Sequence, residues 1–110
     1  MLSEKLHTAL NEQMNFEFYS AHAYMAMAAF CTDQDYDGFA NFFLVQAEEE
    51  RFHAMKFYNF LSDMGYRASI HGFDSPENHF DSILHAFKTA MSHEKEVTRR
   101  MNVSTQRWHF

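Results

Sequence analysis

The chain has 110 residues, of which 46% are hydrophobic and 17% aromatic, and its formal net charge is −6. This length and composition predict one globular domain and exclude a disordered chain. The acidic balance argues against nucleic acid as a partner, because phosphate binding needs a clustered basic surface, and it favours cations. With 3 glycines and 1 proline, the sequence suits long helices and an all-α fold rather than a turn-rich β fold.

The sequence contains no candidate segment for membrane insertion or export. Its longest nearly apolar run, residues 23–31, is far too short to cross a bilayer. The first ten residues lack the basic start and apolar stretch of a signal peptide. The single cysteine, Cys31, excludes an intrachain disulfide and fits a reducing compartment. We therefore expect a cytoplasmic protein without membrane contact.

The first two predicted helices form a hairpin. One spans residues 3–31, with Ser3 as a candidate N-cap, and ends at the polar turn TDQDYDG. The second spans residues 38–64 and stops at Gly65, a residue type that commonly ends helices. The turn between them has about six residues, which suits antiparallel neighbours.

The third predicted helix follows the segment DSPEN, with Ser75 as its cap and Pro76 in its first turn, and continues at least to residue 101. The connection before it, about fourteen residues long, could extend roughly 45 Å at about 3.3 Å per residue. A helix of about 27 residues is only roughly 40 Å long. We therefore expect a long crossover that makes the second and third helices parallel.

Each predicted helix carries a row of residues at alternating spacings of four and three, the pattern that faces the centre of a helical bundle. Apolar residues dominate the rows, but glutamate interrupts each of them near its midpoint. The rows are Leu10, Met14, Glu17, Ala21, Tyr24, Ala28 and Cys31; Phe39, Phe43, Gln46, Glu50, His53, Phe57, Phe60 and Met64; and Phe80, Leu84, Phe87, Met91, Glu94, Thr98 and Met101.

Four ionisable side chains are predicted to meet at one level inside the bundle: Glu17, Glu50, His53 and Glu94. Buried carboxylates that repel one another need either protons or a bound cation. Glu50 and His53 are three residues apart, so they share a helix face and can grip the same ion. Three carboxylates and one imidazole suit iron or manganese, with zinc as a further option. The alternative is that these glutamates face water.

Three further side chains near this level are of interest. Tyr24 could hydrogen-bond a metal ligand, donate an electron, or simply pack in the core. Glu49 points about 100° away from Glu50, and we expect it in solvent unless it holds a looser ion. His93 adjoins Glu94 but lies off the row, so we expect it to be exposed.

Three stretches of the sequence resemble the bacterial non-haem ferritins, within the wider group of ferritin-like di-iron carboxylate proteins. These stretches are LNEQMNFEFYSAHAYMAMAAFC at residues 10–31, GFANFFLVQAEEERFHAMKFYNFLSDMG at residues 38–65 and HEKEVTRR at residues 93–100. The resemblance implies a four-helix bundle with the metal site inside each subunit. It makes Glu17, Glu50 and His53 the ligands of one iron, with Glu50 bridging to a second iron that Glu94 holds.

The resemblance also implies roles for two neighbouring residues and an activity. Glu49 would match a residue of a third, weaker iron position, and Tyr24 would match a tyrosine beside the ferroxidase centre. The implied enzyme is a ferroxidase, which oxidises Fe(II) with dioxygen or peroxide at a site that holds two irons when complete. The ferric product would be stored as mineral inside a hollow homo-oligomeric shell of 24 subunits.

The end of the sequence departs from this pattern. The family has a fourth long helix with a further pair of acidic or amide ligands and then a short fifth helix, whereas residues 97–110 contain no Asp or Glu. We therefore expect a single ferritin-like domain over residues 1–110 that is C-terminally incomplete, with a divergent tail at residues 102–110. A fragment, a truncation or a shifted reading frame would each produce such a chain.

Two alternative functions remain open from the sequence. A rubrerythrin-like di-iron peroxidase would be favoured by a second Glu-x-x-His motif. A non-catalytic remnant of the family would bind metal weakly or only pack against other subunits. Because three helices leave Phe and Met side chains facing water unless another copy covers them, we also expect an isolated monomer to be unstable or to associate.

Overall fold

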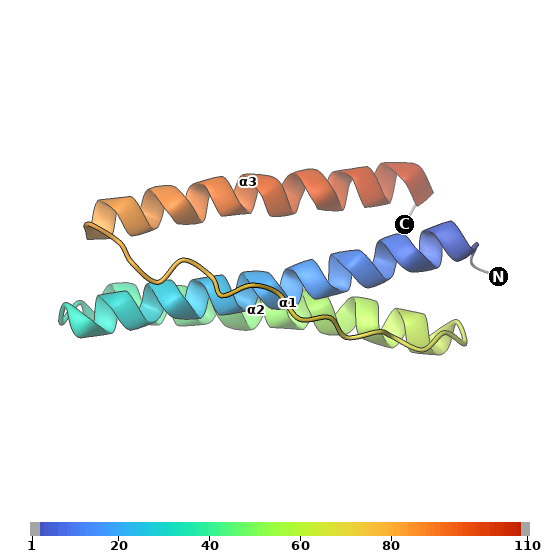
Figure 1. The fold of residues 1–110 in the computed structure, drawn as a ribbon, viewed down its shortest axis with the longest axis horizontal. Coiled ribbons are helices and arrows are strands. Elements are labelled where there is room, and N and C mark those ends of the chain that lie inside the picture. The colour runs from blue at the N-terminus through green and yellow to red at the C-terminus, as the bar shows by residue number, and fades with distance from the viewer. Residues whose placement is uncertain (1–2, 109–110) are drawn as a thin grey trace.

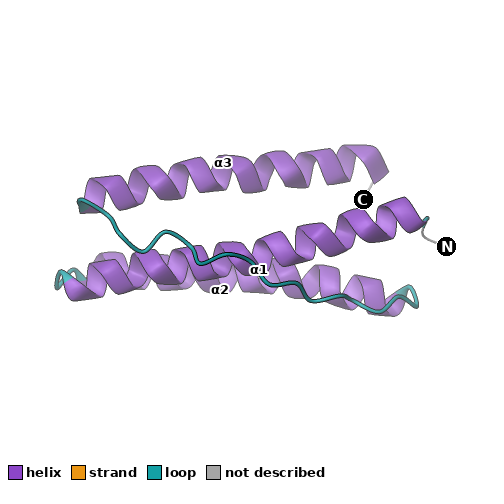
Figure 2. Ribbon diagram, in the orientation of Figure 1, coloured by secondary structure: helices purple, strands orange, loops and turns teal. Residues whose placement is uncertain are grey.

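Three long helices make up the computed structural model, which describes the backbone of residues 3–108 and the side chains of residues 3–100 (Figure 1). The helices are α1 (Glu4–Asp33), α2 (Asp37–Asp63) and α3 (Ile83–Trp108), and residues 3–108 contain no strand (Figure 2). The molecule measures 50 × 22 × 22 Å. No helix within the described residues combines the length and apolarity that a membrane span needs. The predicted all-α fold is confirmed.

The α1–α2 hairpin begins and ends as its sequence predicts. The Ser3 hydroxyl caps α1 by accepting a hydrogen bond from the Leu6 N–H, with 3.1 Å between nitrogen and oxygen. α2 ends where Gly65 takes a φ of 83°, a left-handed conformation that favours glycine. The Tyr66 N–H then donates to the Leu61 carbonyl at 2.9 Å, which closes the end of the helix.

A crossover over residues 64–82 returns along the bundle and makes α3 parallel to α2, as predicted (Figure 1). The predicted start of the third helix at Ser75 is wrong, because α3 begins only at Ile83. Ser82 caps it instead, and its hydroxyl accepts a hydrogen bond from the His85 N–H at 3.0 Å. The crossover therefore extends over residues 64–82 and is longer than the fourteen-residue connection first expected.

The predicted core row is correct for α1 and partly wrong for α2. Every member of the α1 row, from Leu10 to Cys31, is buried. In α2 the row is shifted by one residue at several positions, because small side chains face α1 at the closest approach. The buried positions are Ala40, Phe43, Ala47, Glu50, Ala54 and Leu61, whereas Phe39 and Met64 are exposed and Gln46, His53, Phe57 and Phe60 are half-buried.

The predicted row of α3 is also partly wrong. Leu84 and Met91 are each 62% exposed, and Ala86 and Ala90 are buried in their place. The backbone of α3 approaches α1, whereas it meets α2 only through side chains, such as Phe87. The side chain of Met101, the last member of that row, lies outside the described residues. Thr98 is exposed, so the face of α3 that points toward α1 is rotated from the predicted one.

Candidate metal centre

Three side chains from the α1–α2 hairpin converge at mid-height in the bundle: Glu17 from α1, and Glu50 and His53 from α2. The His53 Nδ1 atom lies 3.9 Å from Glu17 Oε1 and 4.0 Å from Glu50 Oε2. One ligand atom from each residue lies within 4.8 Å of the other two. Ligands at about 2.0–2.2 Å from a common ion are separated by about 4 Å or less, so a small inward movement would let all three bind one ion.

Four buried polar atoms of this cluster have no hydrogen-bond partner among the described residues. Glu17 is 0% and Glu50 is 3% exposed, and both oxygens of Glu17, Oε2 of Glu50 and Nδ1 of His53 are buried without a partner among the described residues. Native proteins pair most of their buried polar atoms, since each unpaired one costs about 1–3 kcal/mol. Four such atoms facing one another therefore indicate a place for a cation or for protons.

The pKa values of the two buried glutamates also indicate a place for a cation or for protons. Burial, followed by the adjacent Glu17 carboxyl, raises the pKa of Glu50 to about 9. Burial also raises the pKa of Glu17, and the negative charge of Glu94 adds to this effect. Without a cation, the pair is thus held partly protonated at neutral pH. A divalent ion would replace those protons, so metal binding at this site would release protons to solvent.

Glu94 on α3 lies close to the cluster but outside the compact group of three. Its carboxylate accepts a hydrogen bond from the Tyr24 hydroxyl, which joins α1 to α3. Burial and this hydrogen bond raise the pKa of Tyr24, so the phenol keeps its proton. The structure therefore places Tyr24 against a predicted metal ligand, which was one of the alternatives for it. The roles of Glu94 and Tyr24 in metal binding stay predictions.

A cavity of about 310 Å³ opens beside Glu94 and Tyr24 on the side where α2 and α3 face each other. Its lining is mainly apolar and includes Phe42, Phe87 and Met91. Glu94 and Gln46 also line it, so the carboxylate can be reached from this side. Glu49 is exposed on α2 and does not join the cluster, and its role at a third metal position stays a prediction.

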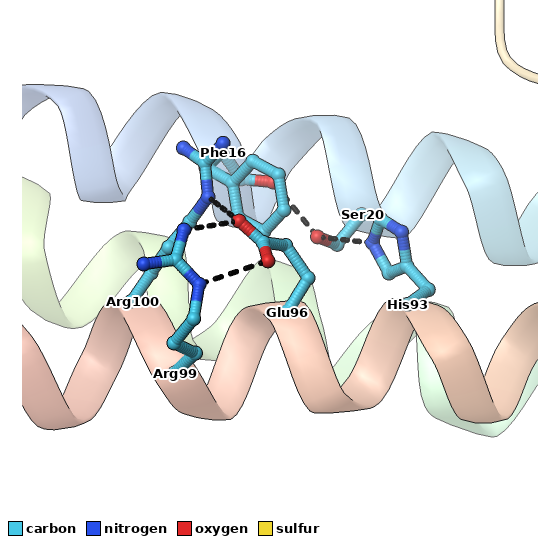
Figure 3. Close-up of polar contacts among 6 residues, drawn as sticks. All are labelled: Phe16, Ser20, His93, Glu96, Arg99 and Arg100. Carbon is cyan, nitrogen blue, oxygen red and sulfur yellow. Dashed lines mark hydrogen bonds and ion pairs between the residues drawn. The ribbon is translucent and has the colours of Figure 1, made fainter.

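His93 does not have the exposure that its sequence position suggested. It is half-buried, its ring stacks on Phe16 at 5.5 Å between centroids, and its Nε2 lies 2.7 Å from the Ser20 hydroxyl (Figure 3). Burial lowers the pKa of His93. The prediction was wrong because α3 is rotated, which turns His93 toward α1. The useful signal in the sequence was Ser20, a polar residue between the apolar positions of α1.

Asn11 and Asn15 are a second feature that the sequence analysis missed. The Asn11 side chain exchanges two hydrogen bonds with the backbone of Ser69, at 2.7 and 3.0 Å. Asn15 accepts the His71 N–H at 2.8 Å and donates to the Ser69 carbonyl at 2.9 Å. These bonds fasten the crossover to the same helix that carries Glu17. Two buried asparagines four residues apart on a helix face could have indicated such a backbone partner.

The fold and the cluster define a class of protein, an all-α bundle with a buried carboxylate–histidine group at its centre that could hold a metal ion. A family model described as the ferritin-like domain matches residues 7–107. The chain therefore belongs to the ferritin-like domain family.

Similar proteins agree with this assignment. The chain is 55% identical over 100 residues to a bacterial non-heme ferritin of Staphylococcus aureus. The matched region covers 91% of this chain and 60% of that protein. The corresponding ferritin of Staphylococcus saprophyticus is 53% identical over the same length. An open-pore ferritin structure from Archaeoglobus fulgidus superposes with a TM-score of 0.92 at 39% identity, covering 96% of this chain and 65% of that one.

A ferritin structure from Chlorobium tepidum superposes equally well, with a TM-score of 0.92 at 35% identity. The chain spans 60% of the length of the curated relatives and 65% of this structure's chain. What those longer proteins do is therefore a proposal for this chain.

Proposed function

We propose that this chain takes part in iron storage and detoxification, as a ferroxidase subunit that binds Fe(II) at Glu17, Glu50 and His53. The observation that carries the proposal is the buried group of carboxylate and imidazole atoms that lack partners and lie within 4.8 Å of one another. Membership of the ferritin-like domain family makes iron the favoured ion. Iron is here the substrate, and each Fe(II) loses one electron to dioxygen or peroxide.

Glu94 is proposed as a ligand of a second iron, with Glu50 shared between the two ions. Its position supports this role, since its charge raises the pKa of both Glu17 and Glu50 and it borders the cavity next to the cluster. Carboxylates stabilise Fe(III) more than Fe(II), so such a ligand set favours the loss of an electron. Glu49 is proposed only as a looser, solvent-side position on α2.

The proposed context is a homo-oligomer in the cytoplasm. The relatives' names support the first part, because these proteins are ferritins. The shell of 24 subunits is what the sequence resemblance implies. The single buried cysteine is compatible with a reducing compartment. Ferric mineral would collect inside such a shell.

Anoxic titration with Fe(II), followed by exposure to air, tests the proposal. Wild-type protein should bind iron and then develop ferric absorbance quickly, whereas Glu50→Ala and His53→Ala should weaken binding at least about tenfold. Glu48→Ala is the matched control, because Glu48 is exposed on the same helix. Absence of binding in the wild type, or unchanged binding in both site variants, would favour the non-catalytic alternative.

A further inference from the structure

A stripe of side chains on α1 contacts α3 at the height of His93 and Glu94. Phe16, Ser20 and Tyr24 are spaced by four residues, so they lie one above another on one helix face. Each contacts α3: Phe16 and Ser20 meet His93, and Tyr24 meets Glu94. Because the backbone of α3 approaches α1 and not α2, this stripe contributes to the placement of α3, together with the buried Ala86 and Ala90.

The contact between Ser20 and His93 is a directional hydrogen bond. The Ser20 hydroxyl donates to the Phe16 carbonyl at 2.8 Å, so its oxygen can only accept from a further partner. When the Ser20 hydroxyl donates in this way, the Nε2 atom of His93, at 2.7 Å, is the donor to its oxygen (Figure 3). Ser20 is 0% exposed, so bulk water does not reach its hydroxyl while the His93 ring is in place.

The rings around His93 limit its movement. The His93 ring is tilted only 17° from the plane of Phe16, and it meets Tyr24 edge-on with 5.9 Å between ring centroids. The guanidinium of Arg100, which is also bonded to Glu96, lies 3.9 Å above the same Phe16 ring (Figure 3). The imidazole is thus held between α1 and α3 at a fixed height.

Consecutive residues on a helix point about 100° apart. His93 and Glu94 therefore contact α1 in two different directions around the axis of α3. Loss of one contact would remove one of the two polar restraints on the rotation of α3. We propose that His93 is a positioning residue, whose hydrogen bond to Ser20 fixes the rotation of α3 and thereby keeps Glu94 turned toward Glu17 and Glu50. This inference rests on the proposed role of Glu94 as a metal ligand.

Two substitutions at His93 separate its ring from its hydrogen bond. His93→Phe keeps a ring that can stack on Phe16 but removes the donor. His93→Gln loses the ring but keeps an N–H group at about the reach of Nε2. Ser20→Ala removes the acceptor with a much smaller change in volume. His22→Phe is the matched control, because His22 is exposed on α1 and its Nδ1 contacts the Phe18 carbonyl of its own helix.

Anoxic Co(II) titration, followed by visible absorption and calorimetry, gives the readout. Wild-type protein should bind Co(II) in a first step that needs Glu50 and a second step that Glu94→Gln abolishes. His93→Phe and Ser20→Ala should each weaken the second step at least about tenfold and leave the first within about twofold. His93→Gln should restore most of the second step, and the double variant should add little to either single one.

Three outcomes would overturn the inference. An unchanged second step in His93→Phe and Ser20→Ala would show that Glu94 needs no such support. Equal weakening of both steps, in variants that melt cooperatively, would indicate a general packing role. Failure of His93→Gln to recover any binding would exclude the hydrogen bond as the cause. Absence of the first binding step in the wild type would instead refute the proposed function itself. The Glu50 variants test that function separately from the role of His93.

Discussion

Glu50 is the residue in which burial and charge conflict most directly. It projects into the bundle from the centre of α2, between Glu17 and His53, and one of its oxygens has no partner among the described residues. The carboxylate can be stabilised there by a proton or by a cation. The two options predict different behaviour of the protein with and without metal.

The first prediction concerns the stability of the metal-free protein as pH changes. The folded pKa of Glu50 is raised from about 4.5 to about 9, so the folded state binds the proton more tightly than the unfolded state. The free energy of unfolding should therefore fall as pH rises from about 4.5 to about 9, by up to about 1.4 kcal/mol per pH unit for this proton. Urea unfolding in EDTA at several pH values measures this slope.

Glu50→Gln should flatten that profile, because the amide stays neutral at every pH. Glu48→Gln is the control, since Glu48 is exposed and should leave the slope unchanged. Parallel profiles for wild type and Glu50→Gln would mean that the Glu50 carboxyl is ionised in the folded protein despite its burial.

At the scale of the helices and their connections, asparagines hold the crossover on α1. Asn15 bonds to the Asn11 carbonyl at 2.9 Å as well as to Ser69 and His71, so one side chain supports three backbone groups. The crossover has no regular structure of its own between residues 66 and 80. Its path therefore depends on these side-chain bonds.

The second prediction is that Asn15→Leu loosens the crossover. Leucine has a similar shape but leaves the His71 N–H and the Ser69 carbonyl with fewer partners, which should cost about 1–3 kcal/mol. Hydrogen exchange at the His71 amide should accelerate, whereas amides in the centre of α1 should change less. Asn59→Leu, at an exposed position on α2, provides the comparison. Equal exchange at His71 in both variants would contradict the proposed anchoring.

The helices and their order could be predicted from the sequence, because caps, turns and the length of the crossover are local signals. Glu17, Glu50 and His53 could also be found, since each interrupts an apolar row at the same height. The rotation of α3 could not be predicted, because its closest contact is made by small residues such as Ala86 and Ala90. A pattern based on large apolar residues assigns the wrong face of α3 to the core. His93 was misplaced for the same reason.

For the molecule as a whole, an exposed apolar surface lies between α2 and α3. Apolar side chains on both helices are exposed there, including Phe39, Phe42, Leu84 and Met91. Phe87 lies among them and contacts Phe42 and Phe43 through its ring. A contiguous apolar surface of this kind favours association with another protein surface.

The third prediction is that the protein in solution associates through this surface. Light scattering should give a mass that rises with concentration above 13.1 kDa. Leu84→Gln combined with Met91→Gln should shift the protein toward the monomer by at least about fivefold in dissociation constant, because less apolar area is buried on association. Met25→Gln is the control, since Met25 is 53% exposed on α1 and does not line the cavity. A monodisperse monomer that melts cooperatively would disprove the prediction.

The division of the cluster between helices has a consequence for the order of folding. Glu17, Glu50 and His53 all belong to the α1–α2 hairpin, whose two helices are joined by a short turn. α3 follows the long crossover and can pack against α1 only once that crossover has folded back along the bundle. Contacts between near neighbours in sequence form fastest, because they close smaller loops. A metal ion that binds the hairpin early in folding would therefore link α1 to α2. α3 would then pack against a hairpin that metal binding had already stabilised.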